Sequence, residues 1–551
     1  MTASPPDSSR RLKYAWGAAA AVILLVLYVA FTRHDAAPAV PAPSADSQAQ
    51  AKTELQRQLK ATLDGLRPER LYVSANVQDT VGDLNLWWAG FSEADPPQDA
   101  APYAAAMQKW LGDAAAANAS AERFSVRDAV HIRNALLYRA MAAALVATGK
   151  SQREIAVAAF ETVTRNVALL SSAATSVPID SGEVLLAGRG TPEDRIWILA
   201  EVLRQLGIDV VVLEPATAPE DAAMPARLVG VVIKGEGVLL FDPQMGLPVP
   251  PVDDTAGPLP TEAATVAAAR QNDAIFRQFD VPDGPKYPWT AELLKSANVR
   301  FILDSTYAAG RMRSLQIALP SDYGATLFDG PADSGNPSLE ERIVAAGQDG
   351  DWMADSVSAW SYPEQQLTAY FAVGSDGSED AKKRLATLSG PRVLSKKEVN
   401  DVAQLVEEDS PQPLRVIRVE HLRGNLNEAR RGYGVIREAR PELSGNVEVR
   451  EDAVHWVAVV QMDLQRYDLA VSELQRAQKN YRGGIWSAAT AEALPRCEAL
   501  RGDLQRAIEL AAPAADQKPK LSDAYLLRRW QAQSAAAPTD SVTPPDNVDQ
   551  Q

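Results

Sequence analysis

The segment from Gly188 to Ile208 most strongly constrains the fold, because it carries the start, the buried face and the end of a single helix. Thr191 and Asp194 form a Thr-x-x-Asp variant of the capping box, and Pro192 takes the first helical position, where its missing N–H leaves no hydrogen bond unmade. Apolar residues follow at spacings of three and four, and Gly207 supplies the left-handed turn that ends the helix. The sequence therefore predicts a helix that begins at Pro192 and packs one face against a core.

Three strands are predicted directly after this helix. The run from Val210 to Leu213 is continuously apolar, as expected for a buried strand. Leu228 to Ile233 and Val238 to Phe241 flank the turn at 234–237 and predict a hairpin. One helix followed by an antiparallel sheet indicates an α+β fold for this part of the chain.

With these residues in this order, the segment resembles the transglutaminase-like family. In that family a papain-like core packs a helix that begins with cysteine against strands that carry histidine and then aspartate. The resemblance rests on Leu-Arg-Gln-Leu-Gly-Ile at 203–208 and on Phe-Asp-Pro at 241–243, and it covers residues 180–250. It implies a helix-plus-antiparallel-sheet core preceded by a helical lobe.

The positions that match the family's catalytic residues carry neither a nucleophile nor a base. An ungapped count back from Ile208 places Pro192 at the cysteine position, and residues 228–230, none of them histidine, at the histidine position. A thiolate at a helix start and an imidazole within hydrogen-bond reach are both needed for this chemistry. Asp242 stands at the third position, although the proline after it favours a role in a turn. We therefore predict no catalytic residues, with Pro192 and Asp242 as degenerate family positions.

Other reactive groups have simpler structural explanations. The Thr191 hydroxyl lies next to the lost nucleophile position but is better explained as the helix cap. Cys497, the only cysteine, is predicted to be a small buried hydrophobic residue in a helical repeat. Arg189 and Arg195 flank the helix start, where free N–H groups favour anions, but a solvated basic face paired with the acids at 193–194 is the favoured interpretation. His131, among apolar neighbours, is predicted to be structural.

Composition narrows the classes of partner. The chain has 551 residues, enough for three or four folded units, and a formal charge of −16 that disfavours nucleic acid. Its four histidines show no CxxC or His-x-x-x-His grouping, so no zinc site is recognisable. We predict no metal, no cofactor and no nucleic-acid partner.

The N-terminus predicts a membrane anchor. Arg10, Arg11 and Lys13 precede an uncharged run from Ala15 to Phe31, which is close to one bilayer thickness. A cleaved signal peptide is the alternative, but its apolar region is only ~7–15 residues long. The charge asymmetry predicts a cytoplasmic tail over 1–13, a transmembrane anchor over 14–32, an Ala/Pro/Ser-rich tether over 33–50 and an extracytoplasmic body, in the periplasm or its equivalent.

The body divides by composition into further segments. Residues 51–175 are predicted to form a mostly helical lobe, with a helix from Lys52 to Leu66 and β-like or irregular structure from Tyr72 to Phe91 that buries two tryptophans. The core spans 176–252. A mixed α/β middle region of unassigned role follows at 253–400, with a helix expected at 261–279, and then come helical repeats at 401–531 and a disordered tail at 532–551.

The predicted repeats resemble tetratricopeptide repeats. Three inter-helix turns are each followed by a small alanine, at Ala429, Ala470 and Ala507. These alanines lie 41 and 37 residues apart, longer than the family's ~34, so the connecting loops must be extended. Stacked pairs of this kind present a concave surface that grips peptide or protein. A simple helical bundle is the alternative.

Together these features predict a membrane-anchored extracytoplasmic scaffold or protein-binding protein with a non-catalytic transglutaminase-like domain. Its partner is expected to be a protein or peptide held by the helical repeats. The alternative is a transamidase or peptidase-like hydrolase of the same superfamily with a displaced active site, for which His131 is the best-placed histidine. A third class, an envelope-assembly or secretion subunit, differs from the scaffold only in its partner.

Overall fold

The chain divides into two units, Met1–Leu55 and Gln56–Gln551. A computed structural model describes part of the first unit and most of the second. The first is described only through the N-terminal part of helix α2 (Ala45–Gly65). The described residues are 45–70, 77–94, 100–146, 150–170, 180–216, 227–332, 336–373, 390–399, 402–410, 413–443, 445–512 and 520–536.

The structure corrects the membrane prediction. No helix of the described residues is both long enough and apolar enough to span a bilayer. The membrane-spanning helix of the predicted fold class and the single-pass, extracytoplasmic localisation are therefore not supported, and what stands is a mixed α+β chain. The predicted tail at 1–13 and anchor at 14–32 lie outside the described residues, as do 33–44 of the tether and 537–551 of the tail.

A lobe of helices precedes the sheet. The structure corrects the β-like prediction for 72–91, because residues from Val77 onward are helical. Leu84, Trp87 and Phe91 recur at spacings of three and four on α3, and Trp87 is buried and stacks on Phe91 with ring centroids 5.0 Å apart. The lobe comprises a 3-10 turn at Pro68–Arg70, α3 (Val77–Ala94), α4 (Ala101–Leu111), α5 (Asp113–Ala119), α6 (Val126–Val146) and α7 (Gln152–Asn166).

A six-stranded sheet forms the centre of the second unit, in the order β6-β5-β4-β3-β7-β8. All neighbours pair antiparallel except β7 and β8, which are parallel. The predicted helix and hairpin are confirmed, and the sheet continues into strands from the middle region. The elements are α8 (Ser181–Ala187), α9 (Pro192–Arg204), β3 (Val210–Glu214), β4 (Leu228–Ile233), β5 (Gly237–Asp242), β6 (Leu247–Pro248), β7 (Asn298–Ile302) and β8 (Val357–Trp360).

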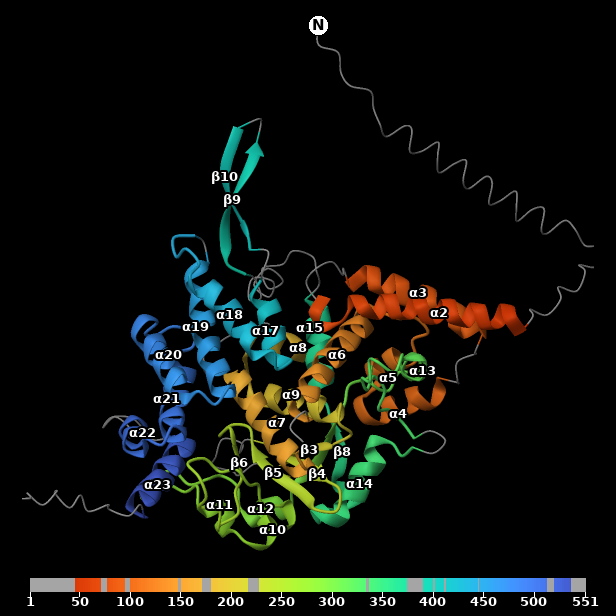
Figure 1. The fold of residues 1–551 in the computed structure, drawn as a ribbon. Helices are drawn as coiled ribbons and strands as arrows, with labels where there is room; N and C mark the ends of the chain where they lie inside the picture. The colour runs from red at the N-terminus through yellow and green to blue at the C-terminus, as the bar shows by residue number, and fades with distance from the viewer. Residues whose placement is uncertain are drawn as a thin grey trace, which may run out of the picture. The chain divides into compact units, whose positions relative to one another are not determined.

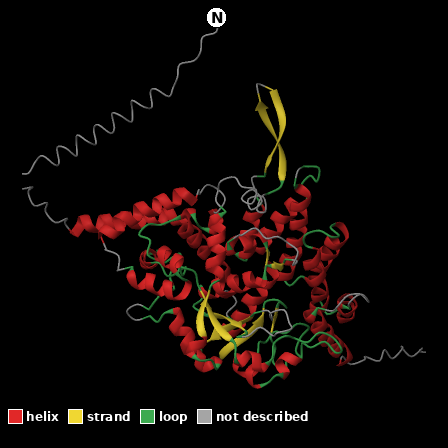
Figure 2. Cartoon of the chain, turned by 180° about the vertical axis from the view of Figure 1, so that it is seen from behind, coloured by secondary structure: helices red, strands yellow, loops and turns green. Residues whose placement is uncertain are grey.

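Helices cover both faces of this sheet (Figures 1 and 2), which explains why its strands are apolar at nearly every position. Val210 and Val212 pack with α6–α9 on one face, whereas Val211 and Leu213 pack with helices from the middle region on the other. The helix expected at 261–279 is instead two short ones. The middle region contributes α10 (Val266–Gln271), α11 (Ala274–Arg277), α12 (Ala291–Lys295), α13 (Gly310–Ala318), α14 (Leu339–Gly350), a 3-10 turn at Ala354–Ser356 and α15 (Tyr362–Ala372).

Three helix pairs make up most of the last third of the chain, after the hairpin of β9 (Arg392–Val399) and β10 (Val402–Asp409). Each predicted inter-helix turn is present, and Ala429, Ala470 and Ala507 are fully buried between helices. Successive helices pack in chain order (Figure 1). They are α17 (Leu414–Leu422), α18 (Leu426–Arg437), α19 (Asn446–Asp463), α20 (Tyr467–Asn480), α21 (Ser487–Leu500), α22 (Leu504–Ala511) and α23 (Leu521–Ala536).

Candidate functional site

The side chains of Thr191 and Asp194 at the start of α9 make the hydrogen bonds that cap the helix. Thr191 N donates to Asp194 Oδ2 at 2.8 Å, and Asp194 N donates to the Thr191 hydroxyl at 3.2 Å, so the capping box is complete. Tyr362 from α15 donates to the second oxygen of Asp194 at 2.9 Å. The Thr191 hydroxyl and the Asp194 carboxylate, on either side of Pro192 in the sequence, therefore hold the helix in place.

The three positions that the sequence resemblance matches to catalytic residues lie at the ends of α9, β4 and β5. Pro192 opens α9, Leu228 opens β4, and Asp242 closes β5 next to the paired residues Val229 and Phe241. Arg227, the residue immediately before β4, donates a hydrogen bond to Glu193 of α9 at 2.7 Å. An arginine–carboxylate pair thus links the helix start to the strand on which the family would place an imidazole.

Asp242 forms a turn. Its carboxylate accepts from Met245 N at 2.8 Å and from the Tyr287 hydroxyl at 2.6 Å, and it is buried. Burial raises the pKa of this carboxyl above its ordinary value. Asp242 therefore serves to fix the 242–246 turn, which is the role that the Asp-Pro dipeptide favoured.

Cys497 and His131 lie in different parts of the molecule. Cys497 is fully buried on α21 beside Leu474 and Leu494, and burial raises the pKa of its thiol to about 12. A thiol in such surroundings is not ionised at neutral pH and is a poor nucleophile. Cys497 and His131 therefore do not form a catalytic pair.

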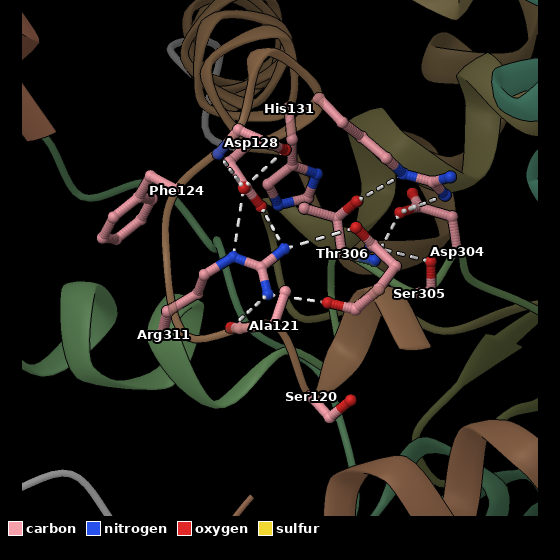
Figure 3. Close-up of polar contacts among 12 residues, drawn as sticks. Ser120, Ala121, Phe124, Asp128, His131, Asp304, Ser305, Thr306 and Arg311 are labelled. Carbon is pink, nitrogen blue, oxygen red and sulfur yellow. Dashed lines mark hydrogen bonds and ion pairs between the residues drawn. The ribbon is translucent and has the colours of Figure 1, made fainter. Parts of the chain in front are cut away.

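His131 belongs to a buried ionic network that ties α6 to the loop after β7 (Figure 3). Asp128 pairs with Arg311 at 2.7 Å, and the Asp128 side chain is fully buried. His131 Nε2 lies 3.0 Å from the Leu327 carbonyl oxygen, and its ring meets the edge of Tyr307 at 4.3 Å. Burial lowers the pKa of His131, and Nε2 donates to that carbonyl, because a carbonyl oxygen can only accept.

This network leaves no room for a substrate. The cavity beside His131 has a volume of about 20 Å³, which is enough for roughly one water molecule. Within the described residues, no hydroxyl or thiol hydrogen-bonds to the imidazole. In the same part of the chain, no group of three or more His, Cys, Asp or Glu side chains is arranged to hold a metal ion. The network fits a structural role.

A large cleft in the described part of the chain lies where the sheet meets the helix pairs. Its volume is about 760 Å³, within the usual range for a binding site of a small ligand. One wall is built by the end of α7, by Arg195 of α9 and by the 244–247 turn that Asp242 fixes. The other walls come from α19, α21 and the start of α23. Apolar surface dominates the lining, which includes Leu169, Met245, Val459, Met462 and Leu521.

The shape of α21 creates much of this space. Ala488, Ala489 and Ala493 line the cleft, and their small side chains leave volume that larger residues would fill. Glu492 and Arg496 follow Ala488 at successive spacings of four, so all three lie on one face of the helix. The helix therefore brings an ion pair, with an N···O distance of 2.8 Å, into an otherwise apolar cleft.

Two polar side chains in the cleft wall, one buried and one half-buried, have buried nitrogen atoms without a hydrogen-bond partner in the described chain. Both ring nitrogens of His455 on α19 lack a hydrogen-bond partner among the described residues, as does Nε of Arg496. His455 is 3% exposed, and burial lowers its pKa to about 3. Buried polar groups in native proteins are generally hydrogen-bonded, so these atoms mark a place where a ligand can supply partners.

Arg195 does not lie on a solvated basic face, in contrast to the prediction. Its side chain is buried and donates to three backbone carbonyls, at 2.8 Å to Val167, 2.8 Å to Pro243 and 3.2 Å to Thr164. Arg189 is half-buried and lies over the Trp486 ring at 5.5 Å. The acids at 193 and 194 bind Arg227 and the helix cap instead.

A second, smaller cleft of about 410 Å³ lies at the turn before α21. Its lining includes the exposed side chains of Gln475, Lys479 and Arg482. Such long side chains are mobile in water, and ordering them opposes binding. The larger cleft is therefore the better candidate for a functional site.

No protein-family model, curated protein or solved structure matches the chain. The resemblances to the transglutaminase-like family and to tetratricopeptide repeats accordingly stay predictions from the sequence.

Proposed function

We propose that the chain is a non-catalytic binding protein that holds a peptide segment in the cleft between its sheet and its helix pairs. The observation that carries this proposal is the cleft of about 760 Å³ with an apolar lining and unpaired buried polar atoms. Apolar walls with a few convergent polar groups are the usual make-up of a binding site.

The chemistry around α9 supports binding rather than turnover. The position where the family has its cysteine is Pro192, the Thr191 hydroxyl caps the helix, and Cys497 is buried elsewhere. A hydrolase or transamidase of this superfamily needs an activated nucleophile and a nearby base. The imidazole that lines the cleft, His455, has no hydroxyl or thiol hydrogen-bonded to it in the described chain. A hydrolase whose active site lies elsewhere in the fold is therefore the alternative that a test must exclude.

A peptide suits the cleft better than a polyanion. The formal charge of −16 repels nucleic acid, whereas the neutral imidazole of His455 offers one donor and one acceptor. A peptide backbone carries the complementary acceptor and donor on every residue other than proline. His455 can thus bind backbone atoms while the apolar walls receive side chains.

The test uses the full chain, immobilised, with a library of short apolar peptides. The variant Ala488→Trp fills the cleft from an exposed helix position, and Val435→Trp, on the exposed face of α18, is the matched control. We expect retention of peptides by the native chain and by Val435→Trp, and loss of at least about tenfold in affinity for Ala488→Trp. Equal retention by both variants would remove the cleft as the binding site.

A further inference from the structure

The cleft wall carries more positive than negative charge, although the whole chain is strongly acidic. Arg195, Arg496 and Lys520 line the cleft around the carboxylate of Glu492, and the other carboxylate of the lining, Glu161, pairs with Arg165. Burial opposes the ionisation of the Glu492 carboxyl, but the three cations together hold the pKa of Glu492 below its ordinary value. Glu492 therefore interacts with three cations at this wall.

The two arginines converge on one point of the 244–247 turn. Gly246 has a φ of +63°, and a Cβ placed on it would lie 3.3 Å from Arg195 Nη1 and 3.8 Å from Arg496 Nη1. Both guanidinium groups thus lie beside Gly246, where the absence of a side chain leaves room for them and for the Thr164 methyl group, 2.6 Å from the same position. Like charges held this close repel, and Arg496 contributes to lowering the pKa of Arg195, after the larger effect of burial.

Nearby acids balance only part of the positive charge around this space. Asp523 interacts electrostatically with Arg496, Glu492 and Lys520, and burial raises its pKa. Asp242 is bound to Tyr287 and the turn, and burial raises its pKa as well. The other arginine of the cleft, Arg165, is matched by Asp463 at 3.0 Å. The three cations Arg195, Arg496 and Lys520 therefore outnumber Glu492 and Asp523, the two acids that lie among them.

A carboxylate supplied by a ligand provides both the negative charge and the hydrogen-bond acceptors that these cationic side chains require. Arginine presents planar donors that match a carboxylate in two parallel hydrogen bonds, and Arg496 Nε is buried and has no partner in the described chain. The volume of the cleft suits a ligand of drug size, so it takes the end of a peptide more readily than a chain that passes through. A free C-terminus supplies a carboxylate at such an end.

We propose that Arg195, Arg496 and Lys520 form a carboxylate subsite that holds the free C-terminus of a peptide whose apolar side chains fill the cleft. This subsite rests on the proposed peptide-binding function and adds the class of ligand to it. Glu492 occupies the subsite in the absence of ligand and competes with the incoming carboxylate. His455, on α19, binds backbone atoms further along the same peptide.

The experiment measures binding of N-acetylated apolar hexapeptides to the full chain, with each peptide made as a free acid and as a C-terminal amide. The free acids are expected to bind at least about tenfold more tightly than the amides, as for the loss of a charge-assisted hydrogen bond. Arg496→Gln is expected to reduce acid binding to the level of the amides. The matched control Arg431→Gln removes an exposed arginine on α18. It is expected to change neither the affinity for the acids nor the affinity for the amides.

Glu492→Gln separates a binding role from a structural one. Removal of the competing carboxylate is expected to tighten acid binding several-fold while amide binding stays the same, a gain that mere loss of stability cannot produce. Equal binding of acids and amides would overturn the subsite but leave the proposed function standing. If neither the peptide acids nor the peptide amides bind, both the subsite and the proposed peptide-binding function are overturned. This holds even if a fatty acid such as dodecanoate binds in their place.

Discussion

The imidazole of His455 lies flat against the indole of Trp486, with ring centroids 4.0 Å apart and ring planes 8° from parallel. Stacking fixes the ring at the wall of the cleft, although neither nitrogen has a hydrogen-bond partner in the described chain. A polar group held rigidly without partners is a preorganised contact for a ligand, because little conformational freedom is lost when it binds.

The burial of His455 makes the stability of the chain depend on pH. Its pKa in the folded chain is about 3, against about 6.5 for an exposed histidine, so the unfolded chain binds more protons between these values. The free energy of unfolding must therefore fall as the pH drops below about 6.5. We expect His455→Phe to lose less stability than the native chain between pH 7.5 and pH 5, as measured by urea midpoints. An identical loss in both proteins would contradict a neutral, buried His455.

Thr191 is predicted to matter for the helix and not for any reaction. Thr191→Val removes the cap of α9, which costs about 0.5–2 kcal/mol, whereas Thr191→Ser preserves the hydroxyl. Hydrogen exchange should show reduced protection in the first turn of α9 for Thr191→Val only. Normal protection in that variant would show that the hydroxyl does not cap the helix.

Asp242 is predicted to support the turn that builds the cleft wall. Asp242→Ala leaves the buried Tyr287 hydroxyl and the Met245 N–H without an acceptor, a loss of about 1–3 kcal/mol for each unsatisfied group. Asp242→Asn retains an acceptor and is expected to be milder. Thermal unfolding measures both, and equal losses in the two variants would show that the charge of Asp242, and not its acceptor oxygens, is the essential property.

The Asp128–Arg311 pair is predicted to be structural (Figure 3). Both side chains are buried, so Asp128→Leu or Arg311→Met alone leaves an unpaired charge and destabilises by about 3–5 kcal/mol. The double variant removes both charges and should recover part of that loss. Thermal midpoints of the three variants provide the test, and additive losses in the double variant would argue against direct coupling.

The parts of the fold that sequence could predict are those with local signals. The cap at Thr191, the glycine at Gly207 and the apolar runs of the strands each act within a few residues, and α9 and β3–β5 form where they were expected. The helix α3 was missed, because the segment 72–91 was predicted to be β-like or irregular. Its burial pattern instead follows the helical spacing from Leu84 to Phe91.

The candidate site could not be predicted in the same way, because it joins distant parts of the chain. Arg195 and Arg496 are separated by 301 residues, and only the folded chain brings them to the same turn. The spacing of four between Glu492 and Arg496 is also typical of an exposed ion pair on a helix. Burial of Arg195 likewise depends on carbonyls from α7 and from the turn at Pro243.

The central claim is that the cleft binds peptides without reacting with them. Its most direct test is to measure the masses of the peptides and of the protein after prolonged incubation together. The full chain is mixed with the apolar hexapeptide acids, glutamine-containing peptides and an amine donor, and both fractions are analysed by intact mass spectrometry. We predict that retained peptides return with unchanged mass and that the protein carries no covalent adduct. Cleaved, deamidated or amine-linked peptides, or an acyl group on any side chain of the protein, would contradict a non-catalytic role.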